Sequence, residues 1–217
     1  MKKKELLSLI EGGENLHCEF KLMFSSHEKI AKEIIAFANT SGGYLLIGID
    51  DDKRIIGVNS EKAEIELLLE TAEKYCEPPI SLVISNVDLL GRDIIIAYVS
   101  PSTNKPHRLQ DYQKFDINIS QVYIRVKDKS ILASKEMVRI LRANSDSLML
   151  KKYSPGNLEK MAFDMLAKKE TLSVNELCEA ANVSYRRASR TLVKLVRVGL
   201  LVIHTKDKGE EYFTSTM

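Results

Sequence analysis

The sequence of 217 residues predicts a mixed α+β domain followed by a small helical domain. Helix-like and strand-like apolar patterns alternate through residues 1–142, which is typical of α+β folds. Residues 144–157 contain three serines, a proline and a glycine, and they interrupt this periodicity. Three helical patterns and two short strand patterns complete the chain. We therefore expect one domain at residues 1–152 and a second at 153–217.

Composition limits the class of protein. Hydrophobic residues make up 44% of the chain, which is enough for two cores, and the net charge of +2 indicates no particular partner. No apolar run approaches the roughly 20 residues of a membrane span, and the basic start leads into an amphipathic helix. Cys18, Cys76 and Cys178 are too widely spaced to suggest a disulfide framework or a zinc site. We expect a soluble protein of the cytoplasm with no membrane partner.

In the first domain, a short helix over 3–10 ends at a pair of glycines and is followed by a strand over 17–23. Ser25 and Glu28 have the spacing of a capping box and begin a helix that runs to Asn39. A strand over 44–49 then turns through three aspartates into a second strand over 55–58, which predicts a hairpin. The remaining elements are a helix from Ser60 to Tyr75, strands over 80–87 and 93–99, a polar loop over 101–120, a strand over 122–126 and a helix after Ser134.

In the second domain, helices are predicted over 158–168, 174–181 and 185–198, and the second is opened by a capping box of Ser173 and Glu176. Two strands, over 200–205 and 211–214, pair around a polar turn. Three helices followed by such a hairpin predict a winged helix-turn-helix.

The last of these helices carries an uninterrupted basic face. The residues on it are Arg186, Arg187, Arg190, Lys194 and Arg197, and apolar residues occupy the opposite face. Arginines on the second helix of a helix-turn-helix suit the major groove of DNA, where they hold phosphates or read guanine. The alternatives are a solvated surface and a winged helix that docks proteins.

Four segments together resemble the Alba-like domain of the Schlafen superfamily over about residues 11–142. They are GENLHCEFK (13–21), AFANTSGGYLLIGIDDD (36–52), KPH (105–107) and YIRV (123–126). The resemblance implies a nucleic-acid-binding α+β domain, with Lys21 among its contacts. Combined with a winged helix, it implies a DNA-binding transcriptional regulator. Because a single lobe resembles half of the two-lobed core of animal Schlafens, we also expect a homodimer.

Some animal Schlafens are metal-dependent ribonucleases that use three carboxylates, and their motif falls on Glu14, Glu19 and Asp50. The resemblance therefore also implies an alternative function, a divalent-metal-dependent endoribonuclease. Oxygen ligands of this kind suit Mg²⁺ or Mn²⁺. Residues five apart on one strand point to opposite faces, so Glu14 would have to approach from the preceding loop. Ordinary roles are also open: a solvated loop acid for Glu14, an exposed strand residue or a partner of Lys21 for Glu19, and turn chemistry for Asp50.

The sequence does not support a histidine metal site or a nucleotide-binding loop. The four histidines show no metal-ligand spacing, and no GxxxxGK[ST] motif is present, so ATP hydrolysis is not expected.

Overall fold

The computed structural model describes residues 1–110, 116, 119–145 and 155–216. The chain divides into two compact units, Met1–Leu132 and Ala133–Met217. This division places the helix after Ser134 with the second unit, whereas the sequence analysis assigned it to the first domain. The predicted boundary between residues 152 and 153 lies outside the described residues and stays a prediction.

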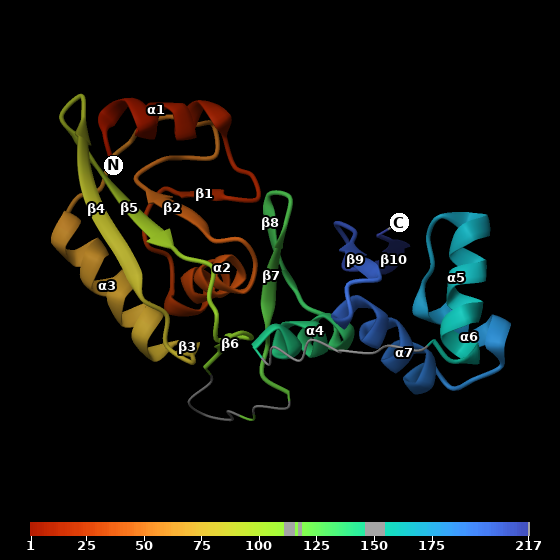
Figure 1. The fold of residues 1–217 in the computed structure, drawn as a ribbon. Coiled ribbons are helices and arrows are strands. Elements are labelled where there is room, and N and C mark those ends of the chain that lie inside the picture. The colour runs from red at the N-terminus through yellow and green to blue at the C-terminus, as the bar shows by residue number, and fades with distance from the viewer. Residues whose placement is uncertain (111–115, 117–118, 146–154, 217) are drawn as a thin grey trace. The chain divides into compact units, whose positions relative to one another are not determined.

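A four-stranded mixed sheet forms the centre of the first unit (Figure 1). Its strands lie in the order β1 (Cys18–Lys21), β2 (Gly43–Ile47), β5 (Arg92–Val99) and β4 (Leu82–Leu89). β1 runs parallel to β2, and the other pairs are antiparallel. The predicted α+β class with a mixed sheet is confirmed.

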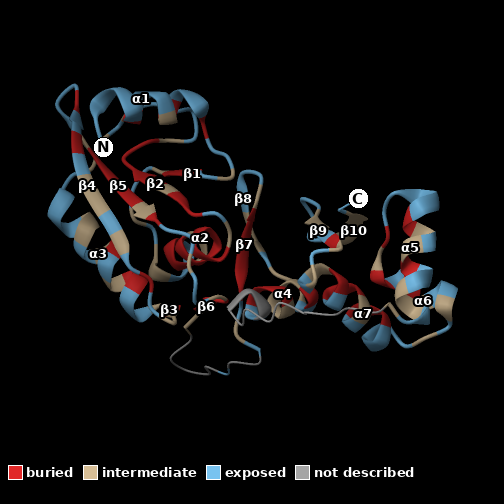
Figure 2. Ribbon diagram, in the orientation of Figure 1, coloured by how far each residue is buried: buried red, intermediate tan, exposed pale blue. Residues whose placement is uncertain are grey.

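Helices cover both faces of this sheet. α2 (His27–Asn39) and α3 (Glu61–Lys74) pack on one face, and α1 (Lys3–Gly12) packs on the other. Because side chains alternate along a strand, Leu45 and Ile47 of β2 enter the core with α2, while Leu46 enters the core with α1. Figure 2 shows β1, β2 and β5 as mostly buried, α2 as largely buried, and α1 and α3 with exposed outer sides.

Two short ribbons complete the first unit. β3 (Cys76–Glu77) pairs with β6 (Arg108–Leu109), and β7 (Tyr123–Val126) pairs with β8 (Lys129–Leu132). β3, β6 and β8 were not expected from the sequence, and β6 lies within the segment predicted as a polar loop over 101–120.

The two glycines after α2 have separate structural reasons. Gly42 has φ +74°, a left-handed conformation that favours glycine. At Gly43, a Cβ atom would lie 2.3 Å from the ring of Phe37, so a side chain there would force the ring to move. The chain can therefore pass from α2 to β2 without strain only when residues 42 and 43 are both glycine.

Two predictions for the first unit are wrong. The cap of α2 is Ser26, whose hydroxyl accepts a hydrogen bond from the Lys29 amide at 3.3 Å, and not Ser25. Adjacent serines offer the same chemistry, so the sequence pattern does not separate them. Residues 55–58 do not pair as a hairpin strand, and only an isolated bridge joins Ile49 to Ile55. Both edges of β2 are already taken, by β1 and β5.

The second unit contains four helices and a hairpin among its described residues. They are α4 (Lys135–Ser145), α5 (Asn157–Lys169), α6 (Val174–Ala181), α7 (Tyr185–Arg197), β9 (Leu201–Thr205) and β10 (Glu211–Ser215). α5, α6, α7 and the hairpin share one core, in which Leu177, Leu192 and Phe213 are fully buried. The capping box is confirmed: Glu176 N donates to Ser173 Oγ at 3.2 Å, and Ser173 N donates to Glu176 Oε2 at 2.8 Å.

None of the helices within the described ranges is long and apolar enough to cross a membrane.

Candidate nucleic-acid interface

α7 has one packed side and one basic side. Ala188, Leu192 and Leu195 are fully buried in the core of the second unit. The five predicted basic residues are all exposed: Arg186, Arg187, Arg190, Lys194 and Arg197. At about 100° per residue, these positions fall within an arc of about 100° on the helix. The predicted separation of the two faces is present in the structure.

Most of the charge on this face is unpaired. Lys194 Nζ lies 3.2 Å from Glu159 Oε1 of α5. The four arginines form no ion pair with any described residue. An exposed row of uncompensated arginines retains its full attraction for phosphate groups.

A three-residue turn connects α6 to α7. Asn182 takes the left-handed conformation, with φ 50° and ψ 49°, and asparagine tolerates this better than most residues. Val183 N then donates to Cys178 O at 3.1 Å, and Ser184 is extended before α7 begins. The turn fixes the direction in which α7, with its basic face, leaves α6.

The structure brings Glu14 and Glu19 of the first unit near one another. Glu14 lies in the loop before β1, as its spacing from Glu19 required, and its Oε1 accepts a hydrogen bond from Phe20 N at 3.0 Å. Burial and the charges of Glu19 and Asp51 raise the pKa of the Glu14 carboxyl, and the Phe20 amide and Lys21 oppose this. The aspartate beside Glu14 is therefore Asp51.

Asp50 has a different environment. Its Oδ1 accepts from Arg54 N at 2.8 Å, and its Oδ2 lies 2.7 Å from Arg54 Nε. These bonds hold the polar turn after β2 together and lower the pKa of Asp50 although partial desolvation acts against them. The alternative role predicted for Asp50, that of a turn residue, accounts for all of these contacts.

β1 alternates between the two faces of the sheet. Cys18 and Phe20 enter the core with α1, so Glu19 and Lys21 point to the face that carries α2. Glu19 is only 6% exposed there, and its Oε1 accepts a hydrogen bond from Lys21 Nζ. The interpretation of Glu19 as a partner of Lys21 fits this geometry, and its interpretation as an exposed residue does not.

Arg125 of β7 is the centre of this buried network, and the sequence analysis did not identify it. Its side chain is 0% exposed, and Nη1 lies 2.9 Å from Glu19 Oε2 and 3.0 Å from Glu33 Oε2. Nη2 donates to Asn15 O at 2.7 Å, and the guanidinium lies 4.8 Å from the ring centre of Phe37. A charged residue inside the apolar strand YIRV is a pattern that indicates a buried partner.

The guanidinium of Arg125 contacts two carboxylates, those of Glu19 and Glu33. Burial and the charge of Glu19 raise the pKa of Glu33, while Ser130, Lys21 and Arg125 counteract the rise. Burial tends to lower the pKa of Lys21, but Glu19, with the charges of Glu33 and Glu14, more than offsets this and raises the pKa, so the ammonium is held charged. Arg125 and Lys21 together neutralise Glu19, one of the three acids that the resemblance identified as metal ligands, and Arg125 also pairs with Glu33.

The described residues contain no group of three or more His, Cys, Asp or Glu side chains arranged to hold a metal ion. Both Glu19 oxygens and both Asp50 oxygens already accept hydrogen bonds from basic residues or from a backbone amide. In this arrangement the donor set does not fit a divalent cation. The metal-binding role of Glu14, Glu19 and Asp50 stays a prediction.

Asn39 and His107, which lie in two of the segments on which the resemblance was based, have structural roles. Asn39 Nδ2 donates to His107 O and to Tyr123 O, both at 2.9 Å, and Asn39 Oδ1 accepts from His107 N at 2.8 Å. The two ring nitrogens of His107 contact Pro78 O and Ser102 Oγ, each at 2.7 Å. Both residues are buried, so they hold backbone segments together and do not face a ligand.

Two solved structures resemble the chain in fold. One is the N-terminal domain of a RecG-related protein from Nitrosomonas europaea, with 22% identity, a TM-score of 0.42, and coverage of 48% of this chain and 80% of that one. The other is the DIP2311 protein from Corynebacterium diphtheriae, with 18% identity, a TM-score of 0.48 and coverage of 98% of this chain. The matched part is 42% of that protein, so this chain spans less than half of its length.

A comparison with protein families agrees with the motifs. The family described as Schlafen, AlbA_2 matches residues 14–134, which include the buried network, the glycine pair and both ribbons of the first unit. This match covers more than half of the chain. The chain therefore belongs to the Schlafen AlbA_2 family.

Proposed function

We propose that this chain is a nucleic-acid-binding protein of the cytoplasm whose second unit is a winged helix-turn-helix that binds duplex DNA. The observation that carries the proposal is the exposed basic face of α7, with four arginines that have no ion-pair partner among the described residues. Membership of the AlbA_2 family supports binding of nucleic acid in general. A DNA-binding transcriptional regulator would use both the basic face of α7 and the AlbA_2 domain.

The order of elements supports this domain type. α6 and α7 are joined by a tight turn, and β9 and β10 follow α7 as an antiparallel hairpin. The second helix of such a pair enters the major groove, where guanidinium groups contact phosphates or guanine edges. The exposed residues of α7 have the side chains that this position requires.

The test is a charge-removal variant measured by fluorescence anisotropy on duplex DNA at several salt concentrations. Replacing Arg186, Arg190 and Lys194 by alanine should weaken binding and reduce the slope of log K against log salt by about three, since each phosphate contact contributes about 0.9. A matched control replaces Lys4, Lys62 and Lys168, exposed residues of other helices, which removes the same charge without changing α7. Equal affinity and slope in the folded α7 variant and wild type would refute the proposed contact.

A metal-dependent ribonuclease is a second candidate, and one observation favours it. Glu14 lies near Glu19 and Asp51, whose charges raise its pKa, although these acids are not arranged to hold a metal ion in this structure. For Glu19 to bind a metal, Lys21 and Arg125 would first have to release it. Addition of Mn²⁺ should then raise the melting temperature of the wild type and leave that of Glu19→Ala unchanged. Cleavage of structured RNA should be lost in the same variant.

A further inference from the structure

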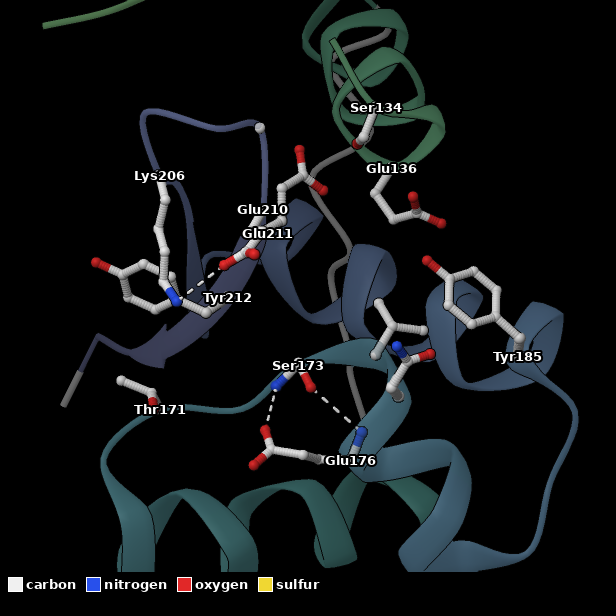
Figure 3. Close-up of a pocket in the computed structure, with 13 residues that line it drawn as sticks. Ser134, Glu136, Thr171, Ser173, Glu176, Tyr185, Lys206, Glu210, Glu211 and Tyr212 are labelled. Carbon is white, nitrogen blue, oxygen red and sulfur yellow. Dashed lines mark hydrogen bonds and ion pairs between the residues drawn. The ribbon is translucent and has the colours of Figure 1, made fainter.

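The second unit contains an open cavity that the DNA-binding proposal does not use. It has a volume of about 800 Å³, within the range of small-molecule sites. Its walls are the starts of α4, α6 and α7 together with the β9–β10 hairpin, as Figure 3 shows. Four glutamates and the ring of Tyr185 contribute to these walls. The cavity is therefore polar and acidic.

Three of the four glutamates already have partners. Glu176 caps α6 and lies 3.0 Å from Lys169 Nζ. Glu210 lies 3.2 Å from Lys206 Nζ, and both residues belong to the β9–β10 hairpin and its turn. Glu136 accepts hydrogen bonds from the Ser189 hydroxyl and from Arg139.

Glu211 is different, because its Oε1 atom is buried and has no hydrogen-bond partner among the described residues. Thr205 faces it across the hairpin, and the Thr205 hydroxyl oxygen is also buried without a partner. Figure 3 shows the Glu211 carboxyl directed toward Ser134 and Glu136. Glu211 is partly buried, and carboxylates in such positions are normally paired with a cation or several donors, whereas Glu211 has no ion-pair partner among the described residues.

The surroundings of Glu211 are negative. Burial and the charge of Glu136 raise the pKa of the Glu211 carboxyl to about 7, and the Ser134 hydroxyl limits the rise. Burial and the charges of Glu136 and Glu211 also raise the pKa of Tyr185. A positive group beside these three side chains would relieve the repulsion between the two carboxyls.

We propose that this cavity binds a small organic cation, a protonated amine or an amidinium, with Glu211 as its counter-ion and Tyr185 as a second contact. The cation would pair with the Glu211 carboxylate, which forms no ion pair with any described residue. The face or hydroxyl of a tyrosine is a suitable neighbour for such a group. The size of the cavity leaves room for an apolar or polar body beyond the charged group.

The site is connected to the basic helix. Tyr185 is the first residue of α7. Glu136 accepts a hydrogen bond from the hydroxyl of Ser189, a fully buried residue of α7. A cation held between Glu211 and Glu136 would compete with Ser189 for the Glu136 carboxylate. The inference that the ligand changes DNA affinity rests on the proposed function, whereas the binding site itself does not.

Binding is tested by calorimetry on the full chain without nucleic acid. The probes are benzamidine, agmatine and putrescine, with neutral benzamide as a matched analogue of the first. At least one cation should bind and benzamide should not. Glu211→Gln should weaken the binding by about ten- to a hundredfold, the effect expected for loss of a charged hydrogen bond. Glu210→Gln, a lining residue that already pairs with Lys206, should bind as the wild type does.

Each outcome decides a separate question. No binding by any of the three cations, equal binding of benzamide, or an equal loss in both glutamine variants with native circular dichroism would overturn the site. The DNA titration is then repeated with the bound cation present. Unchanged DNA affinity would overturn the connection to α7 and leave the site intact. Absence of DNA binding by the wild type itself would refute the proposed function and not the cation site.

Discussion

Replacing Arg125 by methionine should strongly destabilise the first unit. The guanidinium has no exposed surface and bridges Glu19 and Glu33 at 2.9 and 3.0 Å. Methionine keeps an unbranched apolar stem but lacks the guanidinium group, so the substitution removes the charge, its hydrogen bonds and the volume of that group. Two carboxylates would remain buried with only Lys21 to compensate them. Removing one partner of a buried ion network costs about 3–5 kcal/mol, and we expect a loss in this range.

The loss can be localised by urea unfolding combined with hydrogen exchange and mass spectrometry. Peptides from β1 and α2 should show the lower unfolding free energy, because these elements carry Glu19 and Glu33. Arg54→Met is the matched control, since it breaks an exposed ion pair with Asp50 in the same unit and should leave protection of these peptides unchanged.

A second variant tests the cause of the loss. Adding Glu33→Gln to Arg125→Met removes one of the two uncompensated charges, so the double variant should be more stable than Arg125→Met alone. A loss below about 1 kcal/mol in Arg125→Met would show that the network is worth no more than a surface ion pair. Equal stability of the single and double variants would contradict the electrostatic explanation.

Three further predictions concern the capping box, the acidic cavity and association. Ser173→Ala removes a capping bond of α6 and should destabilise the second unit by about 1 kcal/mol in thermal unfolding, whereas Ser184→Ala, whose side chain makes no cap bond, should not. Glu211 faces Glu136 and Ser134, and its pKa rises on folding from 4.5 to about 7, so the folded state binds more protons within this interval. The stability of wild type relative to Glu211→Gln should therefore fall as the pH rises from about 4.5 to about 7, and melting curves of both proteins measure this. Sedimentation at micromolar concentration should show twice the chain mass of 24.5 kDa, and a monomer with and without DNA would contradict the proposed homodimer.

Most helices and strands were predicted from short sequence patterns, because caps, turns and helical periodicity depend on residues that are close in the sequence. The start of α6 was predicted from its capping box, and the two faces of α7 were predicted from its helical period. Strand pairing depends on distant residues. The hairpin expected over 55–58 did not form because β5, about 50 residues later, takes the free edge of β2.

The candidate site was predicted less completely for the same reason. Glu19 was identified from its motif, but Arg125 lies 106 residues away, and nothing near Glu19 in the sequence indicates this partner. The cavity beside Glu211 is formed by the ends of three helices and a hairpin, so no continuous stretch of sequence reveals it.

The hydrogen bonds of Asn39 also have a consequence for the order in which the chain folds. This side chain at the end of α2 bonds to main-chain groups 68 and 84 residues later. β2, which follows it, pairs in the centre of the sheet with β5. Contacts of such sequence separation form slowly, because the loop between them must close first. During synthesis, α2 therefore cannot reach its final hydrogen-bonded state until residue 123 has left the ribosome, and its apolar face needs protection until then.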